Sequence, residues 1–184
     1  MAKPVANLRL FVAIHPPAER SQAMLTALKN PGDLPPFRAT PPDQVHMTLQ
    51  FIGDTPAKDL ENTIESVRRS VAGLPPFDLT PLRLMRLPER GPARLIACET
   101  DAPPTLMELQ HRLAHRLARN ARDCKDQRFR PHLTLCRFRS PAAGLKIEQD
   151  MTTGLFAVRE IRLMRSTLDP AGAQHHEVIA CRLE

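Results

Sequence analysis

The sequence of 184 residues contains no tryptophan and no tyrosine, and aromatic residues make up only 4% of it. A nucleic-acid base could therefore stack only on phenylalanine, histidine or arginine side chains. The four cysteines are scattered along the chain without a CxxC pair, a spacing that argues against a zinc site and against a disulfide framework. We expect free thiols and a cytoplasmic location.

Long apolar runs and glycine-rich loops are also missing. No stretch approaches the roughly 20 apolar residues that a membrane helix needs. The run LRLFVAI at 8–14 contains Arg9 and is followed by two prolines, unlike a signal peptide, so we expect no membrane partner. Because there is no GxGxxG or Walker sequence, a bound phosphate would have to be held by side chains.

What the chain does have is positive charge. Its 26 lysines and arginines against 20 acidic residues give a net charge of +6, with an isoelectric point near 9.7. A basic protein favours polyanionic partners, because neutralising phosphates releases their counterions. Plain solubility gives the same balance, so the charge alone does not identify a ligand. The composition, 42% hydrophobic and 25% charged, is typical of a globular domain.

Apolar periodicity and proline positions predict alternating strands and helices. Helices are expected at 17–30, 56–74 and 103–121. Strands are expected at 8–14, 44–52, 77–87, 93–100, 130–138, 156–168 and 174–183. Each half of the chain therefore places strand, helix and strand around one histidine. This order predicts an α+β fold of two related lobes rather than a doubly wound sheet.

Two of these strands share one pattern, HMTL at 46–49 and HLTL at 132–135. Alternate residues of a strand point to the same face. Each histidine therefore shares a face with the threonine two residues later, while the neighbouring apolar residues point into the core. If the two strands face each other, they present two imidazoles and two hydroxyls. The residues concerned are His46, Thr48, His132 and Thr134.

This set of side chains suits attack on a phosphodiester. A neutral imidazole can take a proton from water and an imidazolium can give one to the leaving oxygen, since histidine titrates near neutral pH. Two hydroxyls can donate hydrogen bonds to the non-bridging oxygens. Arg137, five residues after His132, offers a fork suited to phosphate. Strand alternation turns Arg137 to the opposite face from His132, so it needs a twist or a bulge to reach the site.

The paired motifs resemble those of the 2H phosphoesterase superfamily. The segments LRLFVAIHPP, FRPHLTLCR and STLDPAGAQHHEVIACRL make the chain similar to bacterial RNA 2′,3′-cyclic phosphodiesterases, historically named 2′-5′ RNA ligases. The resemblance implies one bilobal α+β domain over residues 1–184, with an antiparallel-rich sheet in each lobe, helices on the outer faces and the site in a central cleft. It implies hydrolysis of 2′,3′-cyclic phosphates, on RNA ends or nucleosides, to 2′-phosphomonoesters, with no metal or other cofactor.

The resemblance also implies individual roles. His46 corresponds to the histidine that donates a proton and His132 to the one that accepts it. Phe51 stands where an aromatic side chain often contacts a base. Near the C-terminus, where such sequences often carry a tyrosine, this chain has His175 and His176, so no ligand contact is implied there. The residues that would bind phosphate are Thr48, Thr134 and Arg137.

The other histidines are interpreted as structural or solvated. His111 and His115 lie four apart on an expected helix, but the run HRLAH lacks the glutamate of a zincin. Both lie opposite the apolar stripe predicted for this helix, which consists of Leu106, Leu109, Leu113 and Leu117, so a solvated basic face is expected rather than a metal site. His15, between a strand and two prolines, is interpreted as a loop residue. His175 and His176 are adjacent in an expected strand, so they cannot both line one site.

Three other functions compete with this one. A 2′-5′ RNA ligase or phosphodiesterase acting on other RNA or oligonucleotide substrates stays open. A non-catalytic RNA-binding module also stays open, although loss of a motif histidine would favour it and both are present. A metal-dependent hydrolase is disfavoured, because no clustered set of carboxylates and histidines is seen. No obligate protein partner is evident.

Overall fold

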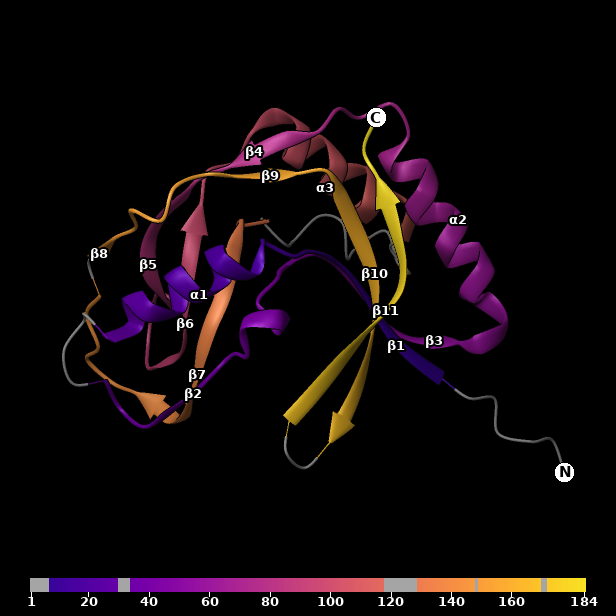
Figure 1. The fold of residues 1–184 in the computed structure, drawn as a ribbon. Coiled ribbons are helices and arrows are strands. Elements are labelled where there is room, and N and C mark those ends of the chain that lie inside the picture. Colours follow the sequence, from indigo (N-terminus) through magenta and orange to yellow (C-terminus); the bar gives the residue numbers. More distant parts are fainter. Residues whose placement is uncertain (1–6, 30–33, 118–128, 148, 170–171) are drawn as a thin grey trace, which may run out of the picture.

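The structure, a computed structural model, describes residues 7–29, 34–117, 129–147, 149–169 and 172–184. It combines helices with antiparallel sheets (Figure 1), which confirms the predicted α+β class. The described helices are α1 (Ala18–Thr26), α2 (Leu60–Val71) and α3 (Pro104–Leu117), with short 3-10 turns η1 (Ala27–Lys29), η2 (Pro42–Gln44) and η3 (Ala57–Asp59).

The first sheet has the strand order β11-β10-β1-β3, and each neighbouring pair is antiparallel. Its strands are β1 (Asn7–Ile14), β3 (Met47–Pro56), β10 (Glu160–Asp169) and β11 (Gly172–Arg182). Strands from both ends of the described chain therefore share this sheet, and the HMTL motif leads into it. The closing hairpin completes this sheet, because β10 pairs with β1.

The second sheet comes from the middle of the chain and has the order β2-β7-β6-β5-β8. Its strands are β2 (Phe37–Ala39), β5 (Pro81–Leu87), β6 (Ala93–Thr100), β7 (His132–Ala142) and β8 (Gln149–Asp150). The HLTL motif opens β7. Each motif strand pairs with a strand that comes before it in the sequence and is separated from it by a helix. β3 pairs with β1, with α1 between them in the sequence, and β7 pairs with β6, with α3 between them.

Two short strands connect the sheets. β4 (Phe77–Leu79) pairs with β9 (Phe156–Val158), and Figure 1 shows them side by side. Because β4 leads into β5 and β9 into β10, the strands predicted at 77–87 and 156–168 are each broken in two. The strands β2 and β8 were not predicted, since two or three residues are too short to show an apolar period.

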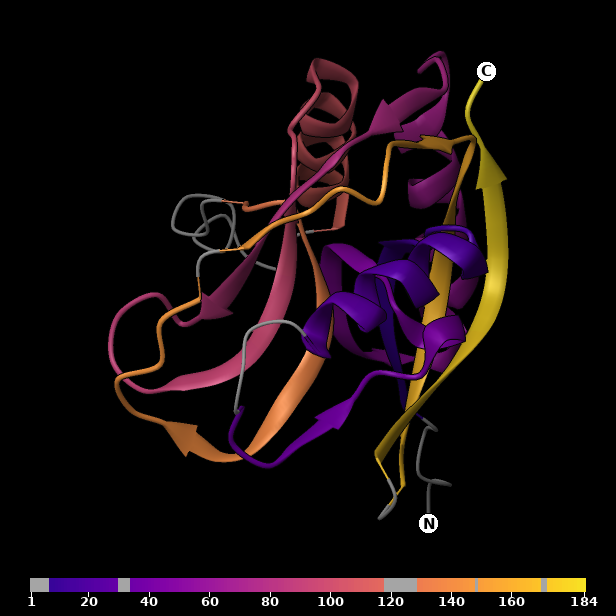
Figure 2. The same ribbon diagram turned by 60° about the vertical axis from the view of Figure 1, so that its left-hand side comes forward.

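The helices cover the sheets with their apolar sides. α2 packs against α3 and β11, and α3 packs against β3. In the predicted leucine stripe of α3, Leu106, Leu109 and Leu113 are fully buried, as expected of an amphipathic helix. α1 lies apart from α3 in both ribbon views (Figures 1 and 2). Of the described helices, none combines the length and the apolar character that crossing a bilayer requires.

Candidate active site

The two motif strands lie close together, since β3 contacts β7. The apolar residues of both motifs point into the core as predicted, each at most 2% exposed. They are Met47, Leu49, Leu133 and Leu135. The threonines have the opposite facing: Thr48 is exposed and Thr134 half-buried. Each strand therefore has an apolar side that anchors it and a polar side that carries the motif hydroxyl.

Both motif histidines make the same hydrogen bond. The Nδ1–H of His46 donates to the carbonyl oxygen of Gln44 at 2.7 Å, and the Nδ1–H of His132 donates to that of Arg130, also at 2.7 Å. A carbonyl oxygen only accepts, so Nδ1 carries the hydrogen in both rings. Nε2 is then the nitrogen that can exchange a proton with a ligand.

A β-bulge interrupts β7 at the fourth residue of its motif. Ala97 of β6 stands opposite Thr134, but the preceding Ile96 stands opposite Cys136, so Leu135 is an extra residue. Leu135 and Cys136 are consecutive and both fully buried, as two residues on the same side of the strand must be. A bulge of this kind resets which face the following side chains take.

The bulge turns Arg137 back to the face of His132 and Thr134. Strand alternation alone predicted the opposite face, and the bulge supplies the correction that the sequence analysis required. The positive charge of Arg137 helps to lower the pKa of His46 and also that of His175. Arg137 is thus electrostatically coupled to the first motif, although it belongs to the strand of the second.

β3 carries a bulge at the same place in its motif. Ala13 of β1 stands opposite Thr48 and Val12 opposite Gln50, which leaves Leu49 as the extra residue. Phe51, five residues after His46, therefore holds the place that Arg137 holds in β7. The Phe51 ring is 52% exposed, and the guanidinium carbon of Arg9 lies 5.1 Å from its centroid. One strand offers a flat apolar ring where the other offers a cation.

Three rings surround the imidazole of His46. The centroid of Phe11 lies 5.1 Å from that of His46, and the His15 ring lies 5.6 Å from it, both tilted by about 35°. The His175 ring meets His46 edge-on at 5.2 Å. Sequence reasoning did not place His15 or His175 in this site.

Burial among these rings lowers the pKa of His46 to about 4, although the hydrogen bond to the Gln44 carbonyl opposes the shift. Nearby positive charge on His175, Arg137 and His132 lowers it further. The free protein therefore holds His46 neutral at pH 7. An anion bound between these groups would favour the charged imidazole instead.

His15 lies in the loop between β1 and α1, as predicted, but its imidazole is half-buried beside His46 and not simply solvated. Burial lowers its pKa to about 4, with help from the charges of His46, Arg162 and His175. A signal was present in the sequence: Phe11 and Ala13 share one face of β1, and His15 continues that two-residue series. The proline pair that ends the strand hid the pattern.

His175 and His176 take opposite sides of β11, as predicted. His175 is half-buried and stands opposite Ser166, while His176 is exposed and stands opposite Arg165. Burial lowers the pKa of His175, and the charges of His176 and Arg137 add to that effect. Of the two, only His175 reaches the first motif.

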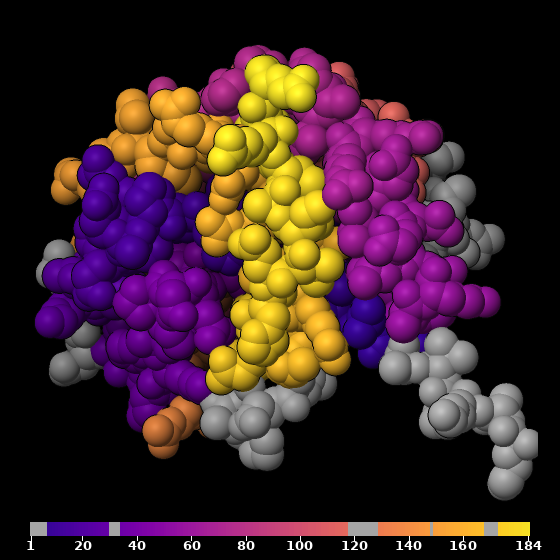
Figure 3. Space-filling view, turned by 45° about the vertical axis from the view of Figure 1, so that its right-hand side comes forward, coloured from indigo at the N-terminus to yellow at the C-terminus, as the bar shows by residue number. Residues whose placement is uncertain are grey.

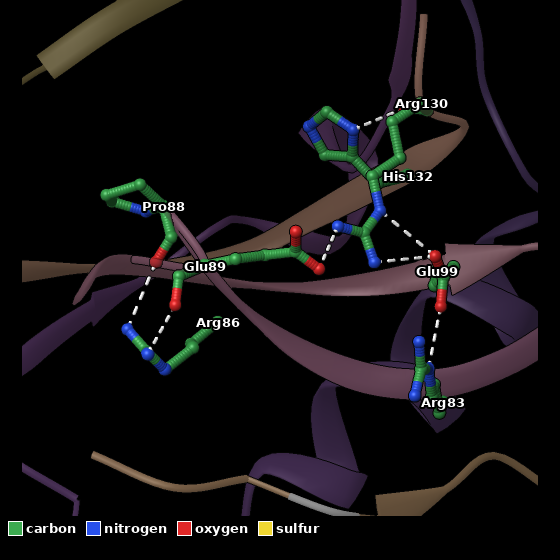
Figure 4. A network of polar contacts seen from close by, with 7 residues as sticks. All are labelled: Arg83, Arg86, Pro88, Glu89, Glu99, Arg130 and His132. Carbon is green, nitrogen blue, oxygen red and sulfur yellow. Dashed lines mark hydrogen bonds and ion pairs between the residues drawn. The ribbon is translucent and has the colours of Figure 1, made fainter. Parts of the chain in front are cut away.

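The second motif histidine lies beside a network of ion pairs, not a cluster of rings (Figure 4). Arg130, whose carbonyl oxygen holds His132, donates to Glu99 through Nε at 3.0 Å and Nη2 at 2.8 Å, and also pairs with Glu89. Arg83 donates to the other oxygen of Glu99 at 2.7 Å. Partial burial raises the pKa of Glu99, but the bonds from Arg83 and Arg130 outweigh it and hold that pKa low.

The remaining sequence candidates lie away from the site. His111 and His115 are exposed on α3, beside Arg112, as expected for a solvated face. In the described part of the chain, no three His, Cys, Asp or Glu side chains are arranged to hold a metal ion. Cys98, Cys136 and Cys181 are buried free thiols, whereas Cys124 falls outside the described residues.

A comparison with protein families decides the relationship. Residues 16–170, which include both motifs, match the family model described as the 2′-5′ RNA ligase superfamily. The chain belongs to this superfamily. The match confirms the resemblance to 2H phosphoesterases that the paired motifs indicated.

Curated relatives in this superfamily include proteins named RNA 2′,3′-cyclic phosphodiesterase. One from Methanothermobacter thermautotrophicus is 28% identical over 149 residues, covering 77% of this chain and 80% of the relative. One from Thermus thermophilus is 27% identical over 176 residues, covering 90% of this chain and 85% of the relative.

Solved structures of the superfamily share the fold along nearly the whole chain. Escherichia coli LigT in complex with 3′-AMP aligns with a TM-score of 0.79 and 26% identity, covering 97% of this chain and 99% of LigT. A crystal structure of a Thermus thermophilus protein aligns with a TM-score of 0.81 and 25% identity, covering 95% of this chain and 97% of that protein. The overall fold of the chain is therefore a known one.

Proposed function

We propose that this protein hydrolyses 2′,3′-cyclic phosphodiester ends of RNA, and nucleoside 2′,3′-cyclic phosphates, to 2′-phosphomonoesters. One observation carries the proposal: two histidines on neighbouring motif strands each hold Nδ1 on a backbone carbonyl at 2.7 Å and leave Nε2 for proton transfer. The names of the relatives, which are RNA 2′,3′-cyclic phosphodiesterases, support the substrate class. The proposal needs no metal ion or other cofactor.

In the proposed reaction, Nε2 of His132 takes a proton from water and the water oxygen attacks phosphorus. The bond from phosphorus to the 3′ oxygen breaks, and Nε2 of His46 gives that oxygen its proton. The products are a 2′-phosphomonoester and a free 3′ hydroxyl, so one water is consumed and one proton passes through each imidazole. General acid–base catalysis of this kind contributes about 10²–10⁴ to the rate.

The low pKa of His46 has to be reconciled with its role as the proton donor. In the free protein, burial and neighbouring positive charge disfavour the imidazolium. A bound phosphodiester brings a negative charge, which favours the charged ring and offsets the repulsion from Arg137 and His132. We therefore propose that substrate binding brings His46 into its acid form.

The phosphate would be held by the hydroxyls of Thr48 and Thr134 and by the guanidinium of Arg137. Both threonines lie on the polar sides of their strands, and the bulge at Leu135 gives Arg137 the same facing. Phe51 is the candidate contact for a base, because it is the exposed ring at the equivalent position of β3. An exposed aromatic ring can stack on any base, since every base has a π-face.

Two further parts of the proposal concern the setting of the protein. A cytoplasmic location is supported by the three described cysteines, which are free thiols. A partner with phosphates is supported by the net charge of +6. The two lobes are proposed to face each other across the site, with one motif on each.

The same arrangement suggests 2′-5′ ligation as a second candidate. A ribose 5′ hydroxyl in the place of water would attack the same phosphorus and form a 2′-5′ bond, with the same two proton transfers. The superfamily carries this activity in its name. Hydrolysis is favoured where water outnumbers the hydroxyl.

The test is an assay of the purified protein with nucleoside 2′,3′-cyclic phosphates in the presence of EDTA. The 2′- and 3′-monophosphate products are separated by chromatography. Formation of the 2′-monophosphate alone, unaffected by EDTA, is expected. Exclusive 3′-monophosphate, or activity that EDTA abolishes, contradicts the proposal. An RNA with a 5′ hydroxyl, added to the same reaction, measures ligation.

A further inference from the structure

The start of β11 reaches the first motif from the far end of the chain. The Nε2 of Gln44 donates a hydrogen bond to the Oε1 of Gln174 at 3.2 Å. The next residue, His175, meets the ring of His46 edge-on, with the centroids 5.2 Å apart. Gln174 thus contacts the residue whose carbonyl accepts the hydrogen bond from Nδ1 of His46, and His175 contacts the His46 ring.

His175 is supported from the other side by Phe11. The two centroids lie 5.0 Å apart in an edge-to-face arrangement, and Phe11 is only 3% exposed. Phe11 also contacts His46 at 5.1 Å. The three rings therefore contact one another in a closed set, with the buried ring of β1 as its fixed member. Edge-to-face contacts at such spacings favour a defined ring angle.

The second motif offers a comparison within the same molecule. There the residue whose carbonyl holds the histidine is Arg130, and its side chain is fixed by Glu99. In the first motif the corresponding residue is Gln44, and its side chain is held by Gln174. In both motifs, another side chain bonds the side chain of the residue whose carbonyl holds the histidine, and for His46 that partner comes from β11.

We propose that the start of β11 positions the first motif histidine: the His175 ring sets the angle of the His46 imidazole, and Gln174 holds the residue whose carbonyl fixes its tautomer. The role rests on the proposed function of His46. His175 is a positioning residue, because it acts through His46. Figure 3 shows β11, in yellow, as a strip between the indigo and violet N-terminal segments and the magenta α2, and the strand packs against β10 and α2.

Titratable and charged groups from several elements face this pair of imidazoles. His15 lies beyond the end of β1, Arg137 and His132 come from β7, and His176 neighbours His175. Loss of the His175 ring would leave those charges in place but would let water reach His46. Burial is the largest cause of the low pKa of His46, so its pKa should then rise.

The experiment compares variants of the full chain. His175→Ala is expected to lower kcat by roughly tenfold to a hundredfold with little change in KM, because a misplaced catalytic group costs up to about that much. His175→Phe keeps an edge against Phe11 and His46 and should recover most of kcat. Gln174→Ala should lower kcat less than His175→Ala does. The matched control is His176→Ala, which removes the exposed neighbour and should leave kcat within about twofold, in line with ordinary surface substitutions.

The decisive readout does not depend on activity. The pKa of the His46 imidazole, followed by NMR, should be higher in His175→Ala than in the unchanged protein, and His176→Ala should not raise it. An unchanged His46 pKa in His175→Ala overturns the positioning role. A raised KM with unchanged kcat also overturns it, because it makes His175 a ligand contact. If His175→Ala does not fold, His175→Gln, which also lacks the ring, replaces it.

Failure of the proposed function gives a different result. In that case the unchanged protein forms no 2′-monophosphate, but the His46 pKa still rises in His175→Ala. The contact between His175 and His46 is then supported, although the proposed reaction is not. If the protein is active and the His46 pKa does not move, the reaction stands and the positioning role falls.

Discussion

The two motif strands share a local design and differ in their surroundings. Both hold the Nδ1 of the histidine on the carbonyl two residues earlier, and both have a bulge at the fourth motif position. His46 is enclosed by three rings, whereas the residue that anchors His132 is fixed by ion pairs. The shared design fixes which ring nitrogen carries the hydrogen, and the rings around His46 lower its pKa.

Under the proposed mechanism, this difference would help to divide two identical side chains into an acid and a base. Removing an imidazole from water disfavours its charged form, so a His46 enclosed by rings is neutral until a ligand brings negative charge. In the second motif, the side chain of Arg130 is bonded to Glu99, and the carbonyl of Arg130 accepts the hydrogen bond from Nδ1 of His132. The asymmetry comes from residues outside both motifs, on β1, β6 and β11.

The largest expected effect is the loss of either imidazole. His46→Ala and His132→Ala should each lower kcat by about 10²–10⁴. The double variant should be little worse than the poorer single variant, since groups that act as a unit are not additive. Steady-state kinetics on a nucleoside 2′,3′-cyclic phosphate measures this. Near-full turnover in either folded single variant would show that the reaction does not need both histidines.

The next effect concerns the groups proposed to hold phosphate. Thr48→Val or Thr134→Val should each cost about 2.7–4 kcal/mol in kcat, the usual loss for one transition-state donor. Arg137→Lys should also impair turnover, because an ammonium cannot reproduce the two-pronged bond of a guanidinium. Arg139→Lys, further along β7, is the matched control. Equal activity in Arg137→Lys and Arg139→Lys would remove Arg137 from the site.

The third effect is acid lability. His46 and His15 have pKa values lowered to about 4 from 6.5, so the unfolded chain binds more protons than the folded one between those values. Stability is therefore complete above about pH 6.5 and falls as the pH drops towards 4. At pH 5 the loss should be about 2 kcal/mol for each imidazole.

Urea unfolding at pH 7 and pH 5 measures that loss. His46→Phe keeps a ring in the cluster but cannot titrate, so its loss between the two pH values should be smaller. His111→Gln removes an exposed histidine and should leave the loss unchanged. A stability that does not change between pH 7 and pH 5 would mean that neither imidazole is buried in its neutral form.

The smallest effect belongs to the ion pairs beside the second motif. Glu99→Gln removes the charge that holds Arg130 but keeps a side chain of the same size. Exposed and partly exposed pairs are worth about 0.2–1 kcal/mol, so stability and kcat should each fall only modestly. Glu108→Gln, which breaks the pair with Arg112 on α3, is the control for a pair remote from the site. If Glu99→Gln lowers kcat no more than Glu108→Gln does, the ion pairs have no role in orienting His132.

The sequence predicted what depends on local pattern. The facing of Thr48 and Thr134 and the burial of the motif leucines follow from strand alternation, and the stripe of α3 follows from helical period. These features need only a few neighbouring residues. The paired motif, with its resemblance, was enough to indicate the family.

The features that sequence reasoning missed depend on pairing between distant strands. The facing of Arg137 is decided by the bulge at Leu135, which only the register with β6 reveals. His175 reaches His46 because β10–β11 pairs with β1, and the bond from Gln44 to Gln174 joins residues 130 positions apart. No local period reports such contacts, and two prolines hid the facing of His15.

We expect His46 to be neutral in the free protein and to become charged when phosphate binds. An NMR titration of the His46 and His132 rings, with and without a nucleoside 2′-monophosphate, tests it most directly. We expect the pKa of His46 to lie well below 6.5, near 4, in the free protein, and to rise by at least about one unit in the complex, as an opposite charge at close range requires. A His46 pKa at or above 6.5 in the free protein, or one that the ligand does not raise, would contradict the account.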